Sequence, residues 1–276
     1  MLIKKQKFFL TAWVVMGTSL VILNGDDAYG KGYQVSCRSA IFSDSTRAKR
    51  LYGKRVTERV LPASTAKVMT ALLVLERLPL DKNVTVSATS TYVQPSKLNL
   101  KPGEQYKVKD LLYAILLSSA NDASIVLAEA VAGSEQSFVK LMNQRAKQLG
   151  AKHTKFANSH GLPTKKMAQY TSAYDMYMIF RQALNHGFFK EAIKFKYKTI
   201  YSAQGRKIAL KSHNKILFMD WNRKIYGKTG YTRAAQSCFV GTLDKGKSTL
   251  IIGVFGCSRR WEDIKFIVNQ YGGVSL

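Results

Sequence analysis

Ser64 and Lys67 stand three residues apart in an apolar stretch, and Lys67 is the sole charged residue between Leu61 and Leu75. On a helix this spacing puts both side chains on one face. A lysine among apolar neighbours such as Val68 is desolvated, which favours its neutral form and lets it accept a proton from a serine. The pair therefore predicts an activated serine nucleophile. The alternative is a lysine that extends to the surface along its own aliphatic chain.

Two further motifs follow along the chain. Ser119 and Asn121 form an S-x-N motif where polar residues interrupt two apolar helical stretches, and Lys228-Thr229-Gly230 immediately precedes a predicted strand. Taken singly, the first motif fits helix capping and the second fits a turn with an exposed lysine. Taken together and in this order, they match the S-x-x-K, S-x-N and K-T-G triplet of penicillin-recognising serine enzymes.

The elements that must position these motifs follow from periodicity and from turn residues. Pro62 and Pro79 bound the helix that carries the first motif. Helices are predicted at residues 64–78, 108–118, 123–131, 134–149, 171–185 and 261–271, and strands at 33–42, from 195, from 231 or 234 to 243, and at 248–256. Residues 44–54 are interpreted as a basic turn region, with a second strand reaching Leu61. Strands therefore lie at both chain ends, with helices between them.

The chain resembles the D-alanyl-D-alanine carboxypeptidases, the low-molecular-mass penicillin-binding proteins of the S11 family of serine peptidases. The local sequence agrees from about Ser39 to Gly272. The matching segments are LPASTAKVMTALLVLE around Ser64, LLSSANDAS around Ser119, FANSHGLP at 156–163, HNKIL at 213–217 and GKTGYT around Lys228. The resemblance implies an α+β / α/β fold of the β-lactamase-like (DD-peptidase) type. In that fold both chain ends form an antiparallel sheet flanked by helices, with a mostly helical insertion at about 85–195.

Two departures from the family pattern stand out. Family members usually carry Gly at the position of Gln236, and a bulky amide there would narrow the substrate groove. Many members continue into a β-rich second domain and an amphipathic C-terminal membrane helix. We expect neither in this chain, and we expect residues 31–276 to form one catalytic domain.

The resemblance also implies catalytic roles. Ser64 would attack the carbonyl between the two terminal D-alanines of a peptidoglycan stem peptide, and Lys67 would accept its proton. Ser119 would relay a proton to the departing amine, while Asn121 would orient both the substrate amide and Lys67. Water would then hydrolyse the acyl-enzyme, again with Lys67 as base. The reaction needs neither a metal nor another cofactor, and β-lactams would act as inhibitors.

Substrate binding is expected at the third motif. Lys228 and the Thr229 hydroxyl, next to Gly230, would bind the free terminal carboxylate by charge-assisted contacts. The backbone N–H groups of Ser64 and Tyr231 would form the oxyanion hole.

Three rivals remain beside a carboxypeptidase. A class A β-lactamase would carry S-D-N as its second motif and a deacylating Glu, whereas residues 156–166 contain no Asp or Glu. A DD-endopeptidase of the same family uses the same acyl-enzyme, so the motifs do not separate it. A catalytically inactive, basic cell-wall-binding protein is the least favoured, because an unpaired lysine in an apolar helix costs stability.

The N-terminus and the charge point to the cell envelope. Residues 1–30 contain a basic start, an uncharged run from Phe8 to Leu23 and small residues at Ala28 and Gly30, which is the layout of a signal peptide or, alternatively, of an N-terminal anchor. We expect export to the periplasm or the outer face of the cell membrane. The net charge of +26 would then attract anionic envelope polymers rather than nucleic acid.

Cysteine and histidine patterns add little chemistry. The three cysteines allow at most one bridge, and buried free thiols are the favoured interpretation; they are Cys37, Cys238 and Cys257. The four histidines have no spacing typical of metal ligands and are interpreted as surface or packing residues; they are His153, His160, His186 and His213.

Overall fold

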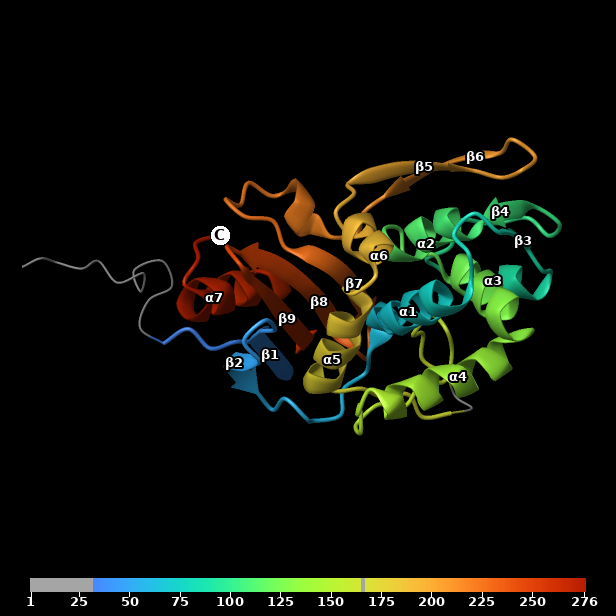
Figure 1. The fold of residues 1–276 in the computed structure, drawn as a ribbon. Coiled ribbons are helices and arrows are strands. Elements are labelled where there is room, and N and C mark those ends of the chain that lie inside the picture. Colours follow the sequence, from blue (N-terminus) through green and yellow to red (C-terminus); the bar gives the residue numbers. More distant parts are fainter. Residues whose placement is uncertain (1–31, 165–166) are drawn as a thin grey trace, which may run out of the picture. The chain divides into compact units, whose positions relative to one another are not determined.

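The computed structural model describes residues 32–164 and 167–276, so the predicted signal peptide or anchor at 1–30 lies outside the described residues. Gln34–Leu276 form one compact unit (Figure 1). In the described part of the chain, no helix is both long enough and apolar enough to cross a membrane.

The main sheet joins the two ends of this unit. Its five strands pair antiparallel in the order β2 (Lys49–Lys54), β1 (Ser39–Asp44), β9 (Ser248–Cys257), β8 (Gln236–Lys245) and β7 (Tyr226–Thr232). The predicted antiparallel sheet built from both chain ends is therefore confirmed. Strand β7 lies at one edge, so one side of it is free to face another element.

Helices cover both faces of this sheet (Figure 1). Helix α5 (Ala173–Ala183) packs against one face, where a Cβ on Gly253 of β9 would lie 3.6 Å from the Ala173 carbonyl. Helix α7 (Arg260–Gly272) packs against the other, where a Cβ on Gly272 would lie 3.1 Å from the Phe42 ring. All ten residues of β9 except two are buried, as expected for a strand covered on both sides.

Between β2 and β7 the chain is mostly helical, with two small two-stranded sheets. The helices are α1 (Lys67–Arg77), α2 (Val108–Leu116), α3 (Asn121–Ala132), α4 (Glu135–Gln148), α5 and α6 (Gly187–Ala192). The short helical turns are η2 (Ala63–Ala66), η3 (Thr89–Tyr92) and η4 (Lys215–Phe218). One small sheet pairs β3 (Asn83–Thr85) with β4 (Gln105–Lys107), and the other is the hairpin of β5 (Tyr197–Tyr201) and β6 (Lys207–Lys211). Helix α1 lies at the centre and is buried from Lys67 to Val74. Its apolar, alanine- and leucine-rich sequence explains that position, because a helix that is apolar on all sides is stable only when it is surrounded.

Local predictions failed where pairing depends on distant residues. The K-T-G motif lies inside β7 rather than before a strand. The region 44–54, predicted as a turn, contains β2, because pairing with β1 outweighs its polar composition. The first motif begins on η2, one turn before α1, because a 3-10 turn often starts a helix.

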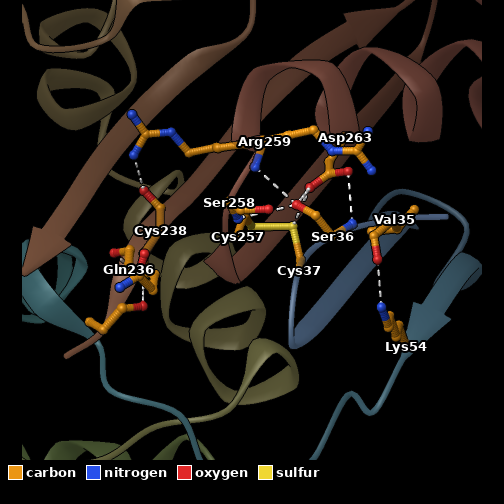
Figure 2. Close-up of a disulfide and its surroundings, with 12 residues drawn as sticks. Val35, Ser36, Cys37, Lys54, Gln236, Cys238, Cys257, Ser258, Arg259 and Asp263 are labelled. Atoms are coloured by element: carbon orange, nitrogen blue, oxygen red, sulfur yellow. Dashed lines mark hydrogen bonds between the residues drawn. A yellow bond between two sulfur atoms is a disulfide. The ribbon is translucent and has the colours of Figure 1, made fainter. Parts of the chain in front are cut away.

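The prediction of free thiols is wrong for two of the three cysteines. Cys37 and Cys257 form a disulfide, and Cys238 is a buried free thiol (Figure 2). The register of β1 with β9 pairs Ser39 with Phe255, so continuing it by two residues brings Cys37 opposite Cys257. That register joins residues 220 positions apart in the chain, which sequence spacing alone does not reveal.

Candidate active site

The first motif places a serine hydroxyl beside a fully buried lysine amine. Lys67 Nζ lies 3.2 Å from Ser64 Oγ, and the Lys67 side chain is 0% exposed. Nζ also donates to Asn121 Oδ1 at 2.6 Å and to the His160 carbonyl at 2.8 Å. Three separate segments of the chain therefore converge on one amine.

The electrostatics of this position favour a neutral lysine. Burial, followed by the nearby charge of Lys228, holds the pKa of Lys67 well below its ordinary value. A neutral amine has two N–H donors and one lone pair. Asn121 and His160 accept from the two donors, which leaves the lone pair for the Ser64 hydroxyl. The arrangement therefore suits proton transfer from the serine to the lysine.

Ser119 lies in the break between α2 and α3, in a left-handed backbone conformation with φ of 59°. A non-glycine residue held in this conformation is strained, and such strain often accompanies a functional site. Lys228 Nζ donates to Ser119 Oγ at 3.0 Å and to the Thr229 carbonyl at 2.9 Å. Burial, followed by the charge of Arg260, lowers the pKa of Lys228 to about 7.

Asn121 is the first residue of α3, and both polar atoms of its side-chain amide form hydrogen bonds within the protein. Its Oδ1 accepts from Lys67, while Nδ2 donates to the Gln94 carbonyl at 2.8 Å. Its backbone N–H donates to the Ser96 carbonyl at 2.8 Å. Asn121 is thus positioned to orient Lys67.

Two glycines allow the close backbone approach that the site requires. A Cβ on Gly230 of β7 would lie 3.1 Å from the backbone nitrogen of Ser64. A Cβ on Gly161 would lie 1.8 Å from the Ala63 carbonyl, and φ at Gly161 is +88°. Both contacts involve η2, so glycine is needed on each side of the turn that carries Ser64.

A cavity of about 820 Å³ opens over these residues. Ser64, Ser119, Thr229, Gly230 and Tyr231 line it together with Arg260. Lys67, Asn121 and Lys228 are not among its lining residues; they lie behind it and are at most 1% exposed. The structure therefore brings together all eight residues predicted from the three motifs, in two layers.

Three residues of the site were missed at the sequence level. Arg260 lines the cavity and donates from Nη1 to the Gly230 carbonyl at 3.2 Å, and its Nε is a buried donor with no hydrogen-bond partner among the described residues. His160 contributes its backbone carbonyl, and Gly161 contributes its lack of a side chain. The FANSHGLP segment was the available signal for the last two, while nothing in the local sequence distinguishes Arg260 from other surface cations.

The structure lends no support to the expectation that Gln236 narrows the groove. Gln236 does not line the cavity, and its Nε2 donates to the Arg233 carbonyl at 2.7 Å. Its φ is 56°, a left-handed conformation that favours glycine. The residue therefore affects a backbone turn at the start of β8 rather than the space for a substrate.

Comparisons with known proteins agree with this geometry. Residues 26–259 match the family described as D-alanyl-D-alanine carboxypeptidase. The chain is 37% identical over 233 residues to a D-alanyl-D-alanine carboxypeptidase of Bacillus subtilis, covering 80% of this chain and 57% of that protein. It is 31% identical to one of Mycobacterium tuberculosis, covering 78% and 72%. A solved structure of a D-alanyl-D-alanine carboxypeptidase from Mycobacterium tuberculosis superposes with a TM-score of 0.81 at 27% identity, covering 88% of this chain and 93% of that one.

Proposed function

Because the chain belongs to the D-alanyl-D-alanine carboxypeptidase family, we propose that it is a serine carboxypeptidase that removes the terminal D-alanine from peptidoglycan stem pentapeptides. The observation that carries the proposal is the Lys67 amine, which lies 3.2 Å from Ser64 Oγ and donates to two internal acceptors. A fully buried lysine whose amine lies beside a serine hydroxyl is the arrangement expected of a general base for that serine.

The proposed reaction begins with acylation. Neutral Lys67 accepts the Ser64 proton as Oγ attacks the carbonyl between the two D-alanines. The backbone N–H groups of Ser64 and Tyr231 stabilise the resulting oxyanion. Ser119 then relays the proton held by Lys67 to the departing amine as the C–N bond breaks, so that Lys67 is neutral again. The Ser119 Oγ accepts a hydrogen bond from Lys228, which supports that role. D-Alanine leaves and an ester to Ser64 remains.

We assign recognition of the substrate's free carboxylate to the part of the cavity lined by Thr229 and Arg260. The Thr229 hydroxyl contacts it directly, and Lys228 supplies positive charge from behind. We add Arg260 to this set, because its guanidinium lines the cavity and packs 4.1 Å from the centre of the Trp261 ring. Charge-assisted contacts of this kind select a peptide that ends in a carboxylate.

Hydrolysis of the ester completes the cycle. A water enters the place left by D-alanine and attacks the ester. Lys67 takes a proton from this water and returns it to Ser64 Oγ as the ester C–O bond breaks. A β-lactam acylates the same serine, and its tethered ring stays in the cavity where the water must enter. The proposal therefore includes inhibition by β-lactams.

The proposal is tested by following intact mass with benzylpenicillin and release of D-alanine from a pentapeptide, using the protein and its Ser64→Ala variant. We expect one stable adduct and D-alanine release, both absent in the variant. Rapid hydrolysis of penicillin without a trapped adduct would favour a β-lactamase instead. A cross-linked peptide dimer, tested in parallel, separates carboxypeptidase from endopeptidase activity.

We also propose that the protein is exported and works at the cell wall. The Cys37–Cys257 disulfide supports this location, because such bonds persist in oxidising compartments. The net charge of +26 supports association with anionic envelope polymers. Binding to purified cell wall that does not weaken between low and physiological salt would contradict the second point.

A further inference from the structure

The β5–β6 hairpin presents an outward face of tyrosines and lysines. Strand residues alternate between faces, and directly paired residues share a face. The pairs on the outward face are Tyr197 with Lys211, Thr199 with Ala209, and Tyr201 with Lys207. Tyr197 and Tyr201 are 59% and 55% exposed, whereas Ile200 and Leu210 on the opposite face are buried. We call these six outward residues the hairpin face.

The hairpin face continues into the cavity that contains Ser64. Ala209 and Lys211 line that cavity, together with Lys215 and Phe218 from η4. The Phe218 ring centre lies 5.6 Å from that of Tyr197 and 5.4 Å from Lys211 Nζ. The hairpin face, Phe218 and the cavity thus form one continuous surface.

The charged side chains of this surface are all positive. Among the described residues that line the cavity, the side chains charged at neutral pH are Lys211, Lys215 and Arg260, all cations. The ion pairs found within residues 32–164 and 167–276 include none of Lys207, Lys211 and Lys215. These lysines are therefore available to an anionic ligand.

The hairpin is held at both ends. At its tip, the Ala203 backbone N–H donates to the Gln105 carbonyl at 2.8 Å, and Arg206 Nη1 donates to Glu104 Oε2 at 2.9 Å. At its base, the His213 N–H donates to the Leu117 carbonyl at 3.0 Å. In Figure 1 the hairpin runs above α2 toward β4. Because these contacts already order the hairpin, binding a ligand to it costs little additional conformational entropy.

We infer that the hairpin face binds the acidic part of the substrate peptide, on the N-terminal side of the bond that Ser64 attacks. This inference rests on the proposed function and adds the recognition of substrate carboxylates remote from the reaction. Lys211 meets the carboxylate nearer to Ser64, because it lines the same cavity, and Lys207 meets one farther along the hairpin. An extended peptide spans about 3.3–3.6 Å per residue, so a few residues suffice to reach from the cavity onto a five-residue strand.

The test compares two pentapeptides that end in D-Ala-D-Ala and differ only upstream, where the carboxylates of residues two and three are either free or amidated. The variant is Lys207→Gln/Lys211→Gln. The matched control is Lys140→Gln/Lys147→Gln, which removes the same charge from exposed positions on α4. Thermal unfolding and acylation by benzylpenicillin verify that both variants fold.

For the unaltered protein we expect a higher kcat/KM with the acidic peptide than with the amidated one, and a smaller difference at high salt. The hairpin variant should lower the ratio of the two values by about two- to thirtyfold, the range for two exposed ion pairs. The control should leave both values unchanged. An unchanged ratio in the hairpin variant, or an equal loss in the control, would overturn the inference.

Failure of the proposed function gives a different result. In that case the unaltered protein releases D-alanine from neither peptide. Fluorescence titration of labelled acidic and amidated peptides against the Ser64→Ala protein then tests the hairpin face by itself. Tighter binding of the acidic peptide that is lost in the Lys207→Gln/Lys211→Gln background would support the inference, and equal binding of both peptides would overturn it.

Discussion

Reducing the disulfide between Cys37 and Cys257 should destabilise the protein strongly. The bond closes a loop of 220 residues, so it removes more conformational freedom from the unfolded chain than a short loop would. The chain-entropy relation gives about 5 kcal/mol for a loop of this size. For a unit of this length each kcal/mol corresponds to roughly 2–4 °C, so the midpoint of thermal unfolding should fall by about 10–20 °C.

Contacts around the bond explain why the fold should survive its loss. Ser36 N–H donates to Asp263 Oδ1 at 2.9 Å, and the Arg259 N–H donates to Ser36 Oγ at 3.0 Å (Figure 2). These bonds hold the chain before β1 against the start of α7 without help from the disulfide. Reduction should therefore lower the free energy of unfolding while leaving the sheet intact at moderate temperature.

The assay is urea unfolding and thermal unfolding with and without a phosphine reductant, with alkylation and intact mass to count free thiols. Burial raises the pKa of the remaining thiol, Cys238, to about 11, so it should resist alkylation in the folded protein. Cys238→Ser should keep the full effect of reductant, whereas Cys37→Ser/Cys257→Ser should unfold early in both conditions. If the thiols of Cys37 and Cys257 are both alkylated and the midpoint of thermal unfolding falls by less than about 3 °C, the loop-closure reasoning is refuted.

Three further predictions concern the active site. The pKa of Lys228 is lowered to about 7, so its positive charge is present below that pH and is lost above it; kcat/KM for a peptide with a free terminal carboxylate should fall on the alkaline side of pH 7. In Lys228→Arg that fall should move to higher pH, because a guanidinium keeps its charge, and an unshifted profile would contradict the assignment. Gly230→Ala places a methyl group 3.1 Å from the Ser64 nitrogen and should lower the rate of acylation by benzylpenicillin by about 10–100-fold. Gly187→Ala is the control: its Cβ would meet nothing within 4 Å, so the acylation rate should not change. Gln236→Gly should change kcat/KM by less than about twofold, since the side chain lies outside the cavity; a tenfold gain would show that it does restrict the substrate.

Local sequence predicted what local geometry controls. The Ser64–Lys67 pair was predictable because helical spacing alone puts the two side chains on one face. The helices α4 and α5 were predictable because serines cap them: Ser134 accepts from the Ser137 N–H, and Ser172 accepts from the Asp175 N–H. In each case the residues that determine the structure lie within one turn of one another.

The failures share a different cause. The disulfide depends on the register between β1 and β9, the placement of K-T-G inside β7 depends on pairing with β8, and the third hydrogen-bonding partner of Lys67 is a backbone carbonyl. A carbonyl has no residue type, so the three motifs did not indicate His160, and only the family resemblance of the FANSHGLP segment pointed to it. Arg260 enters the cavity because α7 begins beside β7 and β8, where its guanidinium donates to the Gly230 and Cys238 carbonyls.

The two layers of the site explain why its chemistry needs such distant segments. The front layer, which includes Ser64 and Thr229, lines the cavity, and the layer behind it holds two lysines at most 1% exposed. Burial lowers the pKa of both lysines, but each has different surroundings. Lys67 is held by acceptors from α3 and from the segment before Gly161, which suits a base that must lose and regain a proton. The pKa of Lys228 is lowered to about 7, and its amine contacts Ser119 and the Thr229 carbonyl, which suits a charge that holds an anion. Two buried lysines thus suit two different roles because the polar atoms around each amine come from different parts of the fold.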